Sequence, residues 1–530
     1  KFLLDTGTQK ILVDGGMFQG DKELRDLNWA AFPLDPATID AVLLTHAHMD
    51  HCGYLPRLVA DGFSGPIWAT DGTEKLAEIV LMDSAKIQEM DAKDAAKGGY
   101  SKHPAPQPLY TTPDVEATMK LFRFADFDID IEVLPGVNAR YYRAGHILGS
   151  ASIRVATSDA EVVFSGDVGR HDHPVLKSRE IPQGAPYVLV ESTYGDREHP
   201  EWDESPHEEL ADAIRRTAKR GGSTLIPAFA VDRTEILLKT LAGMKADGRI
   251  PDLPIYVNSP MGVKALNVYQ DPSQADELRE DLRGSDFVDL QNVHEITSAE
   301  DSIKLNRPSK PCIIIASSGM ATGGRVVHHL EHMLPDPRNT VIFTGYQARG
   351  TRGQSLVSGA KQLKMYGKYI PVRAEVFMDD GFSAHADASD ILDWLKGLDP
   401  KPETVFCVHG EEGAPVLAQR IRDELDIVAV VPVRGEKVLL SGKSGQFVRE
   451  EPVVISAPSA SAKTAKSTKS GRGAKAPAKT AQARVPVKTV KSKLPQDVLD
   501  LIDAAADKGG VSRDDAIAEA IRALYGTSSS

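Results

Sequence analysis

Cysteines and long apolar runs are scarce in this sequence. Cys52, Cys312 and Cys407 are the only cysteines among 530 residues. This sparse and odd set excludes a disulfide framework and predicts a reducing, cytoplasmic environment. No run of about 18 or more apolar residues is present, so we expect no membrane-spanning helix. The first residue is Lys1 rather than Met, and we expect any targeting segment to lie upstream of it.

Basic residues are in the minority. The net charge is -13, with 62 Lys and Arg against 75 Asp and Glu. The stretch from Pro452 to Gln496 is the exception, because it holds ten Lys or Arg and no acidic residue. An acidic body with a basic tether excludes a protein that binds nucleic acid over its whole surface. A polyanion would have to be held by a local patch, by bound metal ions or by the tail.

One stretch concentrates metal-ligand side chains. The apolar run Ala41–Leu44 predicts a buried strand, and His46, His48, Asp50 and His51 follow it within six positions. Three imidazoles and one carboxylate this close together are typical of a metal site. The alternative is a polar turn whose histidines are only solvated.

Two further candidate ligands follow predicted strands. His146 lies in an Ala-Gly-His-Ile-Leu-Gly-Ser run, where the glycines permit close approach of the backbone, and Asp167 follows the strand 161–165. We expect both to join the metal site of the first stretch. We expect His171 and His173, just beyond, to be ordinary loop residues.

These motifs resemble those of a known superfamily. The His-x-His-x-Asp-His run is similar to the signature of the metallo-β-lactamase superfamily, and Glu191-Ser192-Thr193-Tyr194-Gly195 resembles its β-CASP nuclease branch, which includes RNA 3′-end processing endonucleases. Strands alternating with helices from about 196 to 370 predict a parallel α/β cassette. The resemblance implies an α/β fold: a metallo-β-lactamase αββα sandwich with an inserted parallel-sheet β-CASP domain.

Two late motifs continue the resemblance. His385 in Gly381–Asp387 matches the family's general acid, and His409 in Val405–Glu411 matches a metal ligand. DNA-processing members usually have Val at the second position, so the resemblance favours RNA. The cassette departs from the family at Asp232, where Gly commonly precedes the Arg.

The resemblance implies a complete active site. Asp14 would support the metals from behind, and Glu191 would hold His385 charged. Asp50, His385 and Glu191 would be the catalytic residues. Two Zn²⁺ would be held by His46, His48 and His146 on one side and by Asp50, His51 and His409 on the other, with Asp167 and a hydroxide bridging them.

We therefore expect a zinc-dependent ribonuclease that cuts single-stranded RNA with this hydroxide and leaves 5′-phosphate and 3′-hydroxyl ends. A DNA nuclease of the same family, a small-molecule metallohydrolase and a non-catalytic scaffold are the alternatives.

A Ser-rich loop is a second candidate contact. Ser317, Ser318 and Gly319 follow a predicted strand and precede a helix, which suits a phosphate group of RNA. A plain strand-to-helix turn is the alternative. In the following helix we expect His328, His329 and His332 to have surface or packing roles.

The sequence divides into five segments. Residues 1–195 and 371–451 would form the two parts of the metallo-β-lactamase domain around the β-CASP domain 196–370, with helices at about 71–96 and 114–124. Residues 452–484 read as a flexible basic linker. Residues 485–530 resemble a ribbon-helix-helix module that dimerises and can bind nucleic acid, with a helical hairpin as the alternative.

Overall fold

Two β-sheets form the centre of the first domain. The computed structural model describes residues 1–20, 22–98, 106–199, 206–283, 292–442 and 445–450. The first sheet has the order β1-β2-β3-β4-β5, with β1 Phe2–Asp5, β2 Lys10–Val13, β3 Ala41–Leu43, β4 Ile67–Ala69 and β5 Phe122–Phe124. The second has the order β20-β19-β10-β9-β8-β7-β6, with β6 Ile131–Leu134, β7 Val137–Arg143, β8 Ala151–Ala156, β9 Glu161–Phe164, β10 Tyr187–Glu191, β19 Thr404–Val408 and β20 Val428–Val430.

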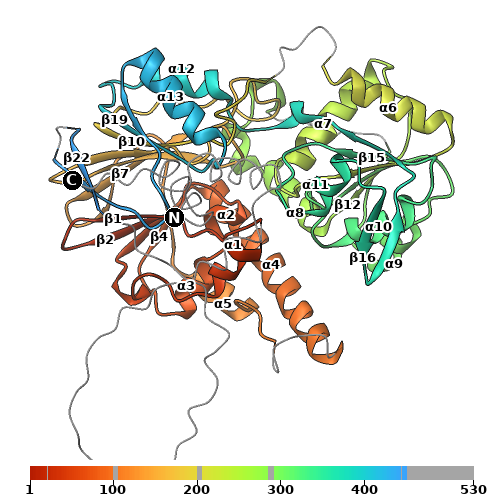
Figure 1. The fold of residues 1–530 in the computed structure, drawn as a ribbon, viewed down its shortest axis with the longest axis horizontal. Coiled ribbons are helices and arrows are strands. Elements are labelled where there is room, and N and C mark those ends of the chain that lie inside the picture. The colour runs from red at the N-terminus through yellow and green to blue at the C-terminus, as the bar shows by residue number, and fades with distance from the viewer. Residues whose placement is uncertain (21, 99–105, 200–205, 284–291, 443–444, 451–530) are drawn as a thin grey trace, which may run out of the picture. The chain divides into compact units, whose positions relative to one another are not determined.

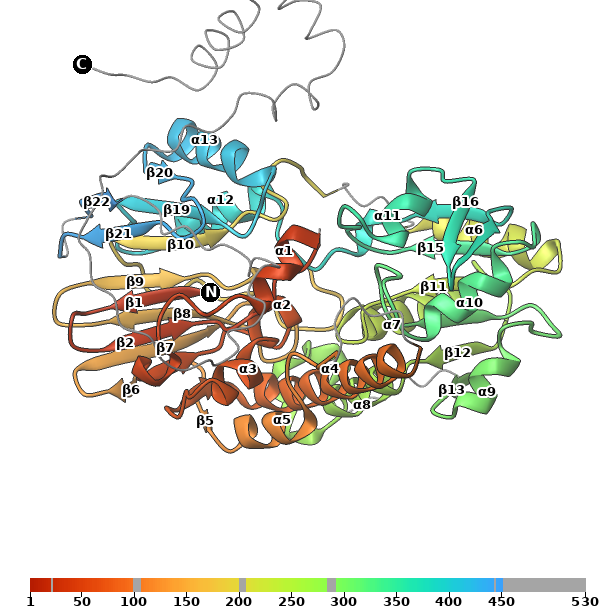
Figure 2. The same ribbon diagram turned by 60° about the horizontal axis from the view of Figure 1, so that its bottom comes forward.

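The two sheets bury one core between them and are covered by helices outside. Ile11 and Leu43 from the first sheet share a buried cluster with Tyr141, Ile153 and Phe164 from the second. The helices of this domain are α1 Lys22–Asp26, α2 Met49–Cys52, α3 Leu55–Ala60, α4 Asp71–Gly98, α5 Thr112–Met119, α12 Ala388–Gly397 and α13 Gly413–Leu425. Helices α3 to α5 share a core with the first sheet, and α12 and α13 share one with β10 and β19. The layers follow the αββα order (Figure 2).

The inserted domain is built on a parallel sheet. Its strands have the order β13-β12-β14-β11-β15-β18, and all neighbours pair in parallel. The strands are β11 Thr224–Pro227, β12 Ile255–Asn258, β13 Val293–Glu295, β14 Ile313–Ala316, β15 Thr340–Phe343 and β18 Glu375–Met378. The helices are α6 Glu208–Lys219, α7 Arg233–Ala246, α8 Pro260–Tyr269, α9 Ala299–Lys304, α10 Arg325–Met333 and α11 Arg352–Val357. Two hairpins, β16 Gln362–Met365 with β17 Lys368–Pro371 and β21 Lys437–Leu440 with β22 Phe447–Glu450, complete the described strands (Figure 1).

The chain crosses between the two domains where the site residues lie. β10 ends at Glu191, and the chain then enters the inserted domain. It returns to the second sheet as β19, which pairs in parallel with β10 so that Val408 lies opposite Glu191. Because both strands point the same way, the residues after Glu191 and after Val408 emerge at the same edge of the sheet.

One expectation differs from the structure, and two others fall on residues that it does not describe. The helix expected at 114–124 is wrong at its C-terminal end: α5 ends at Met119, and Phe122–Phe124 form β5, where Phe122 pairs with Ile67 of β4. The sheet needs an edge strand there, and this long-range pairing overrides the local helical pattern. The ribbon-helix-helix module at 485–530 and the linker 452–484 lie outside the described residues. In the part of the chain that the structure describes, no helix is long and apolar enough to span a bilayer.

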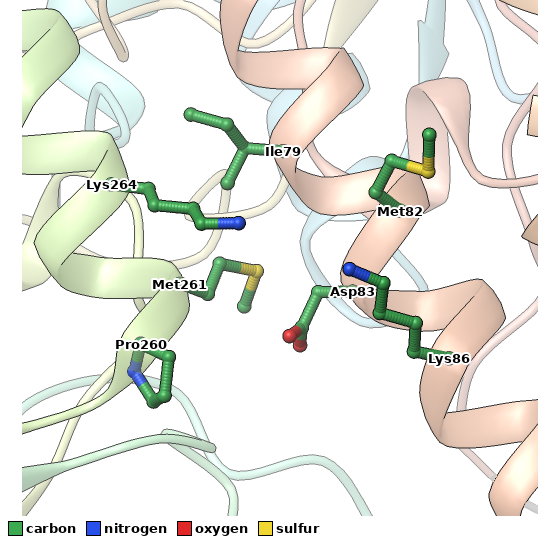
Figure 3. A pocket seen from close by; sticks show the side chains of 7 residues that line it. All are labelled: Ile79, Met82, Asp83, Lys86, Pro260, Met261 and Lys264. Carbon is green, nitrogen blue, oxygen red and sulfur yellow. The ribbon is translucent and has the colours of Figure 1, made fainter. Parts of the chain in front are cut away.

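Helices α4 and α8 bring the two domains into contact at a small hollow. It is lined by Ile79, Met82, Asp83, Lys86, Pro260, Met261 and Lys264 (Figure 3). Burial raises the pKa of Asp83, and the nearby Lys264 and Lys86 oppose this rise. The lining includes none of the predicted site residues, so this hollow belongs to the domain seam.

Candidate metal centre

The first ligand stretch is held by a close approach of two loops. His46 follows β3 and is fully buried, and the short helix α2 carries Asp50 and His51. The loop after β2 touches this helix at Gly16, where a Cβ atom would lie 1.5 Å from the carbonyl oxygen of Asp50. Only glycine fits this contact, which fixes the turn that presents Asp50 and His51.

One group of donor atoms comes from three histidines. His48 Nδ1 lies 3.1 Å from His46 Nε2 and 3.2 Å from His146 Nε2. Asp167 Oδ2 lies 3.5 Å from His46 Nε2 and 3.7 Å from His146 Nε2. The structure thus gathers residues from the loop after β3, from the loop after β7 and from the loop after β9.

A second group lies on the other side of Asp167. His51 Nε2 is 3.2 Å from His409 Nε2 and 3.2 Å from Asp167 Oδ1. Asp50 Oδ2 is 3.3 Å from His409 Nε2. The two oxygens of Asp167 therefore face different groups, as a bridging carboxylate requires.

The donor set fits zinc. Ring nitrogens that carry no proton repel one another at such distances unless a cation lies between them. Four ligands placed tetrahedrally at about 2.0–2.1 Å from zinc have their donor atoms about 3.3–3.4 Å apart, close to the separations of 3.1 and 3.2 Å seen here. Burial and neighbouring histidines also lower the pKa of His46 and of His146, which favours the neutral form that binds metal.

Asp14 lies behind the second group. It is 2% exposed and accepts hydrogen bonds from the Thr45 N–H at 2.8 Å, from the Thr45 hydroxyl at 2.9 Å and from His51 Nδ1 at 2.7 Å. Since the carboxylate only accepts, His51 carries its proton on Nδ1 and keeps the lone pair of Nε2 for the centre.

His385 and Glu191 form a pair beside the first group. His385 Nδ1 lies 3.1 Å from both carboxylate oxygens of Glu191, and the ring centroid of His385 is 4.4 Å from that of His146. The buried Glu191 also accepts the N–H of Val168 at 2.7 Å. Burial opposes a charge on His385, yet the carboxylate of Glu191 raises the pKa of His385 above its ordinary value. The pair thus favours the protonated form of His385, and its Nε2 is the ring nitrogen that Glu191 does not contact.

The predicted phosphate contacts lie elsewhere in the inserted domain. Helix α10 begins at Arg325, so Ser317, Ser318 and Gly319 lie in the loop before it rather than at its first turn. Ser317 Oγ is 2.7 Å from Ser259 Oγ, and Ser318 Oγ is 3.0 Å from Thr322 Oγ1. Among the residues that the structure describes, the hydrogen bonds of this loop stay within the inserted domain, and it does not join the ligand cluster.

The motifs do not single out three side chains that touch the site. Thr45 holds Asp14, and the Thr193 hydroxyl lies 3.2 Å from His409 Nδ1. His199 Nε2 donates to the carbonyl oxygen of His385 at 2.8 Å. Thr45 directly precedes the His-x-His-x-Asp-His motif and Thr193 lies inside the Glu-Ser-Thr-Tyr-Gly motif, which is a usable signal, whereas nothing in the local sequence marks His199.

A two-sheet sandwich with clustered histidines and aspartates at its edge defines a metal-dependent hydrolase. Three family models match the chain in the corresponding order: the metallo-beta-lactamase superfamily over residues 2–228, the Beta-Casp domain over 234–356, and the Zn-dependent metallo-hydrolase RNA specificity domain over 369–432. The chain belongs to the β-CASP family of the metallo-β-lactamase superfamily.

Curated relatives share most of the described chain. Ribonuclease TTHA0252 of Thermus thermophilus is 37% identical over 415 residues, which cover 77% of this chain and 90% of the relative. The transcription termination factor FttA of Methanosarcina mazei is 33% identical over 450 residues, covering 80% and 67%. An RNase J-like protein of Methanocaldococcus jannaschii is 29% identical over 439 residues, covering 82% and 94%.

Proposed function

We propose that this protein is a zinc-dependent ribonuclease that hydrolyses phosphodiester bonds of single-stranded RNA. The observation that carries the proposal is the convergence of seven candidate ligands beside the paired His385 and Glu191. The match to an RNA specificity domain and the ribonuclease among its relatives favour RNA over DNA. The histidine at position 409, within one of the two ligand groups, agrees with that choice.

The ligands divide into two sets that share Asp167. His46, His48 and His146 would hold one Zn²⁺, and Asp50, His51 and His409 the other. Bound zinc supplies positive charge for the phosphate and acidifies water at neutral pH.

The chain's own residues supply the proton for the leaving oxygen. His385 is positioned by Glu191 with Nδ1 engaged and Nε2 directed away from the carboxylate. A protonated Nε2 donates to the 3′-oxygen as its bond to phosphorus breaks. The products are then a 3′-hydroxyl and a 5′-phosphate.

Ser317, Ser318 and Gly319 are the proposed phosphate contacts away from the scissile bond. The hydroxyls of both serines are partly exposed in their loop and already have a hydroxyl partner. A phosphate oxygen accepts from such a pair without burying a charge. Substitution of Ser318 by Ala should raise KM more than it lowers kcat.

The test uses full-length protein with its zinc quantified. RNA labelled at the 5′ or the 3′ end and DNA of the same sequence are incubated with the parent, Asp50→Ala, His385→Ala and the control His332→Ala, whose ring lies on α10 in the inserted domain. We expect RNA cleavage by the parent and the control, none by Asp50→Ala, and a rate at least about 100-fold lower for His385→Ala with unchanged zinc.

The outcomes separate the alternatives. Equal cutting of DNA would make the protein a nuclease without RNA preference, and bound zinc without cutting of either polymer would favour a small-molecule substrate. Loss of zinc in His385→Ala would contradict its role as an acid. Products that a 5′-phosphate-dependent ligase cannot join would contradict the proposed bond breakage.

A further inference from the structure

Asp232 is a buried carboxylate that the proposed chemistry does not use. It directly precedes α7 in the inserted domain, is 2% exposed and has a φ of 68° and a ψ of -52°. A non-glycine residue rarely adopts such a positive φ, and the surrounding structure must hold it there. Its side chain makes no capping hydrogen bond to α7. Helix capping therefore does not explain why a carboxylate is buried at this position.

The carboxylate holds two partners from different elements. Its Oδ1 accepts the hydroxyl hydrogen of Tyr269, at the end of α8, at 3.0 Å. Its Oδ2 lies 3.3 Å from Nε2 of His173. His173 Nδ1 accepts the N–H groups of Val175 at 3.1 Å and Leu176 at 3.0 Å. Nδ1 therefore carries no proton, and Nε2 donates to Asp232.

Tyr269 and His173, the two partners of Asp232, each contact or belong to a loop that carries a candidate metal ligand. The Tyr269 hydroxyl accepts the N–H of Leu148 at 3.1 Å, two residues after His146. His173 lies directly after the turn 171–172, in the segment that follows Asp167. Tyr269, His173 and Asp232 are all buried. One carboxylate of the inserted domain is thus connected to two ligand loops of the first domain.

The loop of His146 depends on this connection. The N–H groups of His146 and Ile147 donate to Ser150 Oγ at 3.0 and 3.2 Å, within the loop itself. The next N–H, that of Leu148, finds its acceptor in Tyr269, across the domain boundary. The loop therefore supplies acceptors for two consecutive amides, and the inserted domain supplies the third.

We propose that Asp232 is a positioning residue that makes the geometry of the metal centre depend on the seating of the inserted domain. Through Tyr269 it fixes the loop of His146, and through His173 it fixes the turn after Asp167. A displaced inserted domain leaves these loops free to shift and release metal. The inference rests on the proposed ligand roles of His146 and Asp167.

The direct test measures zinc release rather than cleavage. Tyr269→Phe removes one hydroxyl and leaves the Leu148 N–H without an acceptor, and Asp232→Asn replaces one acceptor by a donor that faces Tyr269 or His173. In the control Tyr110→Phe, a buried tyrosine of the first domain loses its partly buried hydrogen bond from the hydroxyl to Ser84 Oγ, at 2.8 Å. All are compared with the parent as full chains in the presence of a coloured chelator.

Loss of a group that hydrogen-bonds a metal ligand directly lowers metal affinity by about 10–100-fold. Tyr269 and Asp232 act one step further away, through the loops, so the lower end of this range is expected. We expect zinc release to be about tenfold faster in Tyr269→Phe and in Asp232→Asn, and unchanged in Tyr110→Phe. The double variant should release zinc no faster than the faster single variant, because both changes break one connection.

Three results would overturn the proposal. Parent-like release in both Tyr269→Phe and Asp232→Asn would refute the coupling, and equal acceleration in Tyr110→Phe would reduce it to general destabilisation. A parent that holds no zinc would overturn it together with the proposed ligand roles. A parent that holds zinc but cuts no RNA would contradict the proposed activity alone, and the release rates would still decide the coupling.

Discussion

Replacing Asp14 by Asn tests how the second ligand group is held. Asn has nearly the shape of Asp and tolerates the left-handed backbone at this position, where φ is 62°. The carboxylate accepts three hydrogen bonds, two from Thr45 and one from His51. An amide has a single oxygen, so its NH₂ group must face one of these donors.

The consequence depends on the side that the NH₂ group faces. If it faces His51, the ring accepts on Nδ1 and its proton moves to Nε2, the nitrogen that lies 3.2 Å from His409 Nε2. Zinc must then displace a proton to bind. If it faces Thr45, the buried threonine loses an acceptor and the loop of His46 loosens.

The expected loss is about 10–100-fold in zinc affinity at this group, or about 1.4–2.7 kcal/mol. It is measured by titrating the zinc-loaded protein with a competing chelator and counting the ions that leave. The matched control is Asp128→Asn, which has the same substitution and a φ of 60° but lies exposed on a turn. Parent-like affinity in Asp14→Asn, or an equal loss in Asp128→Asn, would refute the reasoning.

Three further predictions follow from buried groups. Glu191→Gln removes the negative charge that raises the pKa of His385. As pH rises, the cleavage rate of this variant should therefore begin to fall at a lower pH than that of the parent. Profiles of cleavage rate against pH that coincide on the alkaline side would contradict this. Gly16→Ala places a methyl group against the Asp50 carbonyl oxygen. The variant should lose up to about 3 kcal/mol of stability in thermal unfolding and should contain less zinc in metal analysis. A variant with the stability and zinc content of the parent would show that the contact is loose. Burial raises the pKa of Glu277 to about 7 from 4.5, so the free energy of unfolding falls by up to about 3 kcal/mol as pH rises through this window. Glu277→Gln should therefore be more stable than the parent at pH 8 but not at pH 4. An equal difference in stability between variant and parent at both pH values would contradict this.

The ligand cluster could be predicted because its parts are local. His46 to His51 lie within a single loop and helical turn, and Asp167 follows directly on a strand whose apolar pattern marks its end. Two distant residues, the ligand His409 and the acid His385, could be predicted because their motifs follow in the order known for the family. The chain places these side chains together as expected, while their binding of metal stays a prediction.

The connections between distant segments could not be predicted in the same way. Tyr269 and Leu148 are 121 positions apart, and no periodicity in either segment indicates the hydrogen bond that joins them. The strand at Phe122–Phe124 likewise exists because β4 offers it an edge. The departure at Asp232 is visible in the sequence, but its two partners are visible only in the structure.

The insertion between β10 and β19 also orders events during synthesis. Six of the seven candidate ligands precede Glu191, whereas His409 contacts His51 from 358 residues further along the chain. On the ribosome, the first six can gather before the inserted domain has been translated, but β19 cannot pair with β10 until nearly the whole described chain has emerged. With the proposed roles of His385 and His409, a growing chain lacks both the general acid and one metal ligand until β19 has been made. The proposed site is therefore completed only after the inserted domain has been translated.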